Sequence, residues 1–192
     1  MKSLTFMVTL LMFAMSKLST SENGQTHQPF FQANHHQPYH LSIGAVLFDQ
    51  KGRIACHHFE EVFGHKDIYI LMRESMEDNE TPLVTLARGL KEEFGATAQP
   101  LTFLGALSGY LPHSHLPFEK TTLYVACQLI HWDPAERDLA DPEASSTIEW
   151  LEPDTLLFLM EQQGIRFQHR VDADESEIVR RAIPYIQKHI LQ

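Results

Sequence analysis

The stretch from Glu80 to Ala96, ETPLVTLARGLKEEFGA, constrains the fold more than any other part of the chain. Thr81 is suited to cap a helix, Pro82 to occupy its first position and Gly95 to end it. Apolar residues recur between these signals at the spacing of one helix face, which is expected to pack on a core. They are Leu83, Leu86, Ala87, Leu90 and Phe94.

Three charged residues of this helix, Arg88, Glu92 and Glu93, lie off the apolar stripe. Adjacent carboxylates repel each other unless a cation or a basic side chain offsets their charge. Magnesium often binds one or two carboxylates together with a substrate phosphate. The other interpretation is a solvated acidic face with an Arg88–Glu92 pair worth a few tenths of a kcal/mol, which is the commoner case for a charge run.

Length and charge limit the classes of partner. A chain of 192 residues predicts one globular domain with a full core. A formal net charge of −10 argues against binding a nucleic acid polymer, because few phosphates could be neutralised. An acidic enzyme that acts on a phosphorylated small molecule needs metal cations to offset the repulsion. We therefore expect a phosphorylated small-molecule substrate and no firm membrane association, and leave a homodimer open.

The cysteines and histidines do not predict a soft-metal site. Cys56 and Cys127 both lie in apolar, strand-like runs, where a free cysteine behaves as a small buried hydrophobe. The pairs His35–His36 and His57–His58 lack further ligands at zinc-site spacing. Neither a disulfide framework nor a histidine metal centre is expected.

The first 38 residues are expected to lie outside the domain, which we place at residues 39–192. An apolar run from Leu4 to Met15 follows Lys2 and resembles a secretory signal. The run is short for a membrane span, and a translated extension or a short apolar helix would also fit it. Residues 19–38 are polar and are predicted to be a linker. We expect a cytoplasmic protein, or a secreted or periplasmic one if residues 1–16 are a signal peptide.

The rest of the chain alternates strand-like and helical segments. The strands are expected at 40–48, 53–59, 67–72, 101–110, 121–131 and 147–151. A turn is predicted at 49–52, a polar loop at 73–79 and an acidic, irregular segment at 134–146. A helix should run from Pro153 to about Gln162. Asp174 should cap a last helix with Ile178, Val179, Ala182, Ile186 and Ile190 inward. Strands mixed with helices predict an α/β/α sandwich with a mixed sheet.

In this order of strand, loop and acidic helix, residues 40–160 resemble the Nudix hydrolase superfamily, whose pattern is G-x5-E-x7-R-E-U-x-E-E-x-G-U with U aliphatic. Glu80, Arg88, Leu90, Glu92, Glu93, Gly95 and Ala96 match it. The resemblance implies hydrolysis of a nucleoside diphosphate linked to another moiety, with Mg²⁺ or Mn²⁺ as cofactor. It also implies that Glu92 and Glu93 bind the metal and that Arg88, paired with Glu80, holds a carboxylate in place.

Two positions depart from the pattern: Glu74 replaces the opening glycine, and Gly89 replaces the glutamate after the arginine. The resemblance implies that this glutamate is a metal ligand and, in some members, the general base. Position 89 shares a helix face with Glu92 and Glu93, so the glycine removes an oxygen ligand there. It also weakens the helix by about 1 kcal/mol relative to alanine. Close packing, approach of a ligand or a decayed site would each explain it.

Other residues could complete the chemistry, although each is more often an ordinary surface or core residue. Substitute bases on neighbouring loops are Glu74, Glu77, His113, His115 and Glu119. Glu143 or Glu149 could lend a further metal oxygen. The aromatic residues that could stack a base are Phe103, Tyr110, Phe118 and Tyr124.

Two hypotheses follow for the function. The first is a metal-dependent pyrophosphohydrolase with a weakened or rearranged site, which the retained Glu80, Arg88, Glu92 and Glu93 favour. The second is a catalytically inactive Nudix-fold module that binds a nucleotide or a partner, which Glu74 and Gly89 favour. A decaying site should lose the paired acids as readily as its other residues, so the enzyme is the preferred hypothesis.

Overall fold

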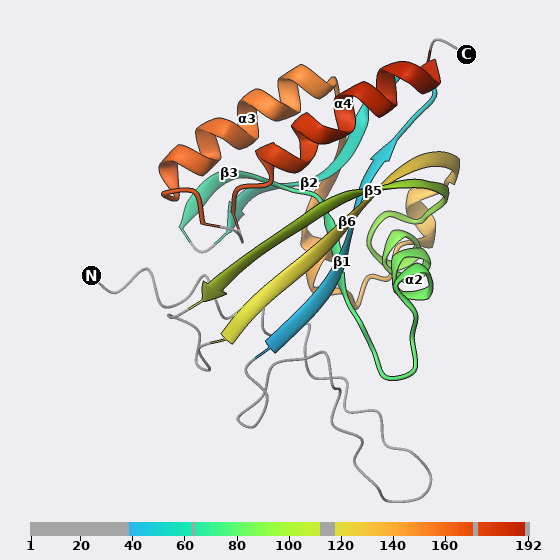
Figure 1. Cartoon of the computed structure of the whole chain (residues 1–192), viewed down its shortest axis with the longest axis horizontal. Helices are drawn as coiled ribbons and strands as arrows, with labels where there is room; N and C mark the ends of the chain where they lie inside the picture. Colours follow the sequence, from blue (N-terminus) through green and yellow to red (C-terminus); the bar gives the residue numbers. More distant parts are fainter. Residues whose placement is uncertain (1–38, 63, 112–117, 171–172, 191–192) are drawn as a thin grey trace, which may run out of the picture.

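The computed structural model describes residues 39–62, 64–111, 118–170 and 173–190. They form one mixed β-sheet with helices packed against it (Figure 1). The sheet order is β3-β2-β1-β6-β5, with β4 added beside β1 and β7 beside β2. The strands are β1 Tyr39–Phe48, β2 Ile54–Val62, β3 His65–Ile70, β4 Met72–Ser75, β5 Ala96–Leu111, β6 Phe118–Trp132 and β7 Thr147–Leu151. Within the described residues, the helices are α2 Pro82–Phe94, α3 Pro153–Arg166 and α4 Ser176–Ile190.

Strand β1 lies at the centre of the sheet. It runs parallel to β6, from the pair Tyr39–Glu119 to the pair Phe48–Gln128, and antiparallel to β4. The last seven residues of β1 are all buried, which its continuous apolar sequence predicts. The predicted turn after it is confirmed, because the Gly52 amide donates to the Asp49 carbonyl at 3.0 Å.

Helices cover both faces of the sheet, so the predicted α/β/α sandwich is confirmed. Helix α2 packs on one face through Leu86, Leu90 and Phe94, which join a core with Ile43, Leu47 and Cys127. Helices α3 and α4 cover the other face, as Figure 1 shows. Their core residues include Leu156, Met160, Ile178, Val179, Ala182 and Ile186.

The buried face of α2 differs from the predicted stripe. Leu83 is 59% exposed and Ala87 is also exposed, whereas Thr85, Gly89 and Glu93 are buried. These three share a helix face because they are spaced four residues apart. On that face Gly89 lies against strand β4, and Thr85 and Glu93 form hydrogen bonds with Glu80 and His57. Hydrogen bonds and the close approach of helix and strand, rather than hydrophobicity, therefore determine which residues this face buries.

The predicted strand at 67–72 is divided, and residues 73–75 belong to a strand rather than to a loop. β3 pairs with β2 up to Ile70, and β4 begins at Met72 and pairs with β1. At the break, the Leu71 amide donates to Glu175 Oε2 at 2.8 Å, and Glu175 also accepts a hydrogen bond from Tyr124 Oη. Glu175, the residue before helix α4, therefore supplies the hydrogen-bond acceptor for the Leu71 amide at the point where the chain passes from β3 to β4.

The remaining predictions have mixed outcomes. The helix after Asp174 is confirmed, and Asp174 Oδ1 accepts from the Ser176 amide at 3.1 Å, but Ile190 is 44% exposed and not a core residue. Cys56 and Cys127 are free and buried. Residues 134–146 contain two short 3₁₀ helices, Pro134–Glu136 and Pro142–Ser145. None of the helices in the described part of the chain is long and apolar enough to span a membrane. The predicted signal-like segment and linker lie outside the described residues.

The caps of α2 agree with the sequence and give a test of the fold. Gly95 ends the helix with φ +64°, and a β-carbon there would overlap the Asp133 carbonyl. We predict that Gly95→Ala lowers the free energy of unfolding by more than the ~1–2 kcal/mol that the left-handed conformation costs alone. Urea denaturation measures the change. Lys91→Ala in the same last turn removes only an exposed ion pair with Glu136 and should cost under about 1 kcal/mol; equal losses for the two variants would contradict the prediction.

Candidate functional site

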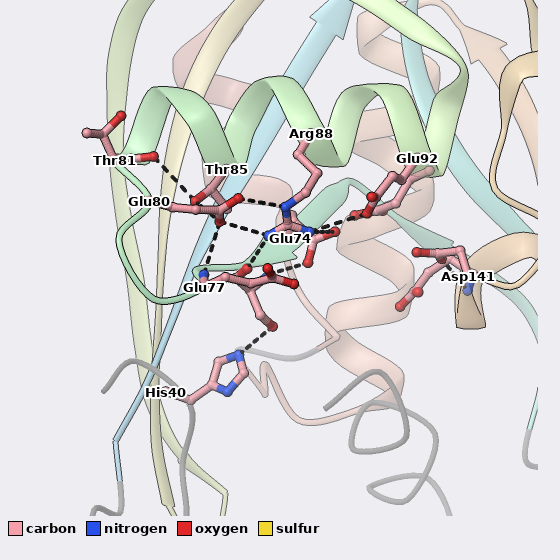
Figure 2. A network of polar contacts seen from close by, with 12 residues as sticks. His40, Glu74, Glu77, Glu80, Thr81, Thr85, Arg88, Glu92 and Asp141 are labelled. Carbon is pink, nitrogen blue, oxygen red and sulfur yellow. Dashed lines mark hydrogen bonds and ion pairs between the residues drawn. The ribbon is translucent and has the colours of Figure 1, made fainter. Parts of the chain in front are cut away.

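Arg88 is the centre of the polar cluster beneath helix α2 (Figure 2). Its Nε and Nη2 donate to the two oxygens of Glu80 at 2.8 and 2.9 Å, a bidentate contact. Its Nη1 lies 3.1 Å from Glu74 Oε2 and 3.3 Å from Glu92 Oε2. Nη2 also donates to the Ser75 carbonyl at 2.9 Å. One guanidinium thus joins the helix to strand β4 and to the loop between them.

Glu80 is held in place by neighbours on both sides of the helix start. Besides Arg88, its Oε2 accepts hydrogen bonds from the Thr85 hydroxyl at 2.8 Å and from the Glu77 amide at 3.0 Å. The hydrogen bonds from Arg88 lower the pKa of Glu80 to about 2. Burial opposes the charge of Arg88, but the contacts with Glu80 and Glu74 outweigh it and raise the pKa of the guanidinium. The predicted Glu80–Arg88 pair is therefore present and ionised.

Three carboxylates from three segments meet beside Arg88: Glu74 from β4, Glu92 from α2 and Asp141 from the loop before β7. One carboxylate oxygen of each residue lies within 4.8 Å of those of the other two, and all three residues are half-buried. Burial, partly offset by Arg88, raises the pKa of Glu74 to about 7. Converging carboxylate oxygens are the donor set that hard divalent cations take, so this group fits Mg²⁺ or Mn²⁺.

Arg137 fastens the Asp141 loop to the end of helix α2. Its Nε donates to the Glu93 carbonyl at 2.6 Å, and its two Nη atoms donate to the Ser146 and Glu143 carbonyls at 3.1 Å each. The Asp138 amide adds a hydrogen bond to the Glu92 carbonyl at 2.9 Å. These contacts satisfy helix-end carbonyls and bring Asp141 to Glu92 across 49 residues of sequence.

Glu93, the second predicted metal ligand, has different surroundings from Glu92. It is buried, and its Oε2 lies 2.7 Å from His57 Nε2, while His57 Nδ1 lies 2.7 Å from Ser146 Oγ. Ser146 Oγ donates to the Glu143 carbonyl, so it accepts from Nδ1–H and leaves Nε2 as an acceptor. This chain of bonds assigns a proton to Glu93.

The electrostatics of the buried pair agree with that assignment. Burial, together with the charges of Glu143, Glu74 and Asp141, raises the pKa of Glu93. Burial also lowers the pKa of His57, which stays neutral. Glu93 thus adjoins the three carboxylates as a neutral acid that is oriented by His57.

The other candidates identified from the sequence are scattered. Glu77 and Glu119 are exposed, and Glu149 binds His58 Nδ1 at 2.5 Å. Burial, together with a hydrogen bond that the protonated carboxyl group donates to Asp141, raises the pKa of Glu143 to about 8. Phe118 and Tyr124 are buried and Phe103 and Tyr110 are exposed. His113 and His115 lie outside the described residues.

Sequence reasoning missed Asp141 and placed Glu74 only among substitute bases. Asp141 sits in an acidic stretch with no periodicity, so composition alone could not distinguish it from its neighbours. Glu74 could have been found from the family pattern, because the two positions that depart from it gain a glutamate at 74 and lose one at 89.

Comparisons with known proteins agree with this architecture. The family model of the NUDIX domain matches residues 38–171. Among solved structures, a protein described as a NUDIX hydrolase from Nitrosomonas europaea is similar, with a TM-score of 0.51 and 13% sequence identity over 77% of this chain and 88% of that chain. At that identity the likeness concerns the fold. No curated protein sequence matches the chain.

The lowered pKa of Glu80 predicts a specific dependence of stability on pH. Because the folded-state pKa is about 2 and the ordinary value is 4.5, the ionised pair stabilises the fold above pH 4.5. That contribution is lost as the pH falls toward 2. We expect Glu80→Gln to cost about 1.5–3 kcal/mol at pH 7 and less at pH 3, as measured by urea denaturation at several pH values. The other carboxylates titrate in both proteins, so their effect cancels in the comparison. A difference in unfolding free energy between the two proteins that stays constant from pH 7 to pH 3 would contradict the prediction.

Proposed function

Because the chain belongs to the NUDIX domain family, we propose that it hydrolyses a diphosphate bond in a nucleoside diphosphate linked to another moiety, with the help of Mg²⁺ or Mn²⁺. The observation that carries the proposal is the convergence of Glu74, Glu92 and Asp141 within 4.8 Å, beside the ionised Glu80–Arg88 pair. A phosphorylated substrate and a chain of net charge −10 need such a cation between them.

In this proposal Glu92 and Glu93 hold the cation together with Glu74 and Asp141. Glu93 lies outside the three residues whose oxygens converge. We include it because it matches an acidic position of the family pattern, and a nearby cation would favour its charged form. His57 then fixes the orientation of Glu93, as outer partners of metal ligands commonly do. When bound, the cation supplies neutralisation of the charge that develops on the nonbridging phosphate oxygens.

Arg88 and Glu80 act as positioning residues. Arg88 Nη1 contacts both Glu74 and Glu92, so it sets the spacing of two proposed ligands from opposite segments. Glu80 binds the other nitrogens and prevents the guanidinium from turning toward solvent or a phosphate. The pair therefore preorganises the carboxylates before a cation or substrate arrives.

The test is a phosphate-release screen on nucleoside diphosphate derivatives, with a phosphatase as the coupling enzyme, in the presence and absence of Mg²⁺ or Mn²⁺. We expect metal-dependent turnover that Glu92→Gln and Glu93→Gln each lower at least about 10–100-fold, since each replaces a carboxyl group of the proposed site with an amide that cannot ionise. Isothermal titration with Mn²⁺ should show a matching loss of affinity.

Glu60→Gln is the matched control, because it removes the same charge from an exposed position of strand β2. Its turnover and Mn²⁺ affinity should equal those of the unaltered protein. Activity that persists in Glu92→Gln would remove this residue from the metal site. Binding of Mn²⁺ or a nucleotide without turnover on any substrate would favour the inactive binding module instead.

A further inference from the structure

Position 89 has no room for a side chain. Gly89 is buried on α2, and a β-carbon built there would lie 2.5 Å from Glu74 Cβ, 2.9 Å from Met72 Sδ and 3.1 Å from Glu74 Cγ. Non-bonded carbon atoms normally stay about 3.5–4.0 Å apart. Any larger residue at position 89 would therefore have to displace Glu74 or the strand that carries it.

The side chain that occupies this space belongs to a well-fixed strand. Glu74 lies opposite Ile43 in the β1–β4 pairing, so its backbone cannot move without breaking the sheet. Its Oε1 accepts from the Ser75 amide at 2.7 Å, and its Oε2 lies 3.1 Å from Arg88 Nη1. Two contacts thus orient the carboxylate toward Glu92 and Asp141, and the strand pairing fixes the backbone that carries it (Figure 2).

Glu74 also supplies the oxygen that position 89 lacks. A glutamate at 89 would share the face of Glu92, three residues further along the helix. Glu74 passes directly under position 89, and its carboxylate ends within 4.8 Å of the ligating oxygens of Glu92 and Asp141. A carboxylate from the strand therefore reaches the group that a carboxylate from the helix would have joined.

We infer that Glu74 and Gly89 form an exchanged pair, in which the strand provides a cation-binding carboxylate and the helix provides the space for it. The ligand role of Glu74 rests on the proposed function, whereas the shared space does not. The exchange explains Gly89 by close packing, and it implies that restoring a glutamate at 89 alone should harm the protein.

A double-mutant cycle on the full chain tests the shared space. Gly89→Glu should lower the melting temperature in metal-free buffer by about 4–8 °C, because it overfills the gap under the helix. Glu74→Gly/Gly89→Glu should regain most of that loss, because the new side chain then occupies the space of the old one. Ala87→Glu, at an exposed position of the same helix, is the matched control and should leave the melting temperature nearly unchanged. Additive shifts in the cycle would overturn the inference.

Titration with Mn²⁺ alone tests the ligand role with the same variants. Glu74→Gly should weaken Mn²⁺ binding at least about tenfold, and the double variant should return to within about threefold of the unaltered protein. Unchanged affinity in Glu74→Gly, or no Mn²⁺ uptake by the unaltered protein, would overturn the inference. If Glu74→Gly loses Mn²⁺ affinity and the double variant regains it, but no diphosphate is hydrolysed, the inference is supported and the hydrolase proposal is rejected. Failure of the inference can therefore be told apart from failure of the proposed function.

Discussion

The contacts of Arg88 are the constraint on which the candidate site depends. Glu74, Glu80 and Glu92 would repel one another if they were brought together without a cation, and the single guanidinium contacts all three. Its bidentate bond to Glu80 keeps the positive charge under the helix, and its bond to the Ser75 carbonyl ties that charge to the strand. Partly burying these charges is costly, so removal of one partner would leave another uncompensated. The acidic site therefore has a fixed geometry before any metal binds.

The site combines ionised and neutral acids that differ in their surroundings rather than in their chemistry. Glu80 is ionised because Arg88 donates to it, whereas Glu93 is neutral because it is buried among other acids and bonded to His57. The loop with Asp141 is held by Arg137, which uses backbone carbonyls rather than carboxylates. Positive charge thus supports the site from two sides, with Arg88 in contact with Glu74 and Glu92 and Arg137 bonded to the loop that carries Asp141. A divalent cation would face mainly carboxylate oxygens.

Sequence patterns predicted the parts of the structure that depend on local rules. The caps of helix α2, the turn after β1 and the central strands follow from turn chemistry and apolar runs. The family resemblance implied the pairing of Glu80 with Arg88, which the structure contains. The buried face of α2 could not be found in this way, because Gly89 and Glu93 are buried for close approach and hydrogen bonding. Asp141 and the break at Leu71 depend on contacts between distant segments, which periodicity does not encode.

The carboxylate of Glu175 links the two sides of the sheet. It lies just before helix α4, on the face away from helix α2, yet it accepts the Leu71 amide where the chain turns into the strand that carries Glu74. It also lies 3.7 Å from Arg73, the neighbour of Glu74. Glu175 therefore contacts the chain three residues and one residue before Glu74. The residue that precedes the last helix thus helps to hold the strand of Glu74 in place, although that helix covers the opposite face of the sheet.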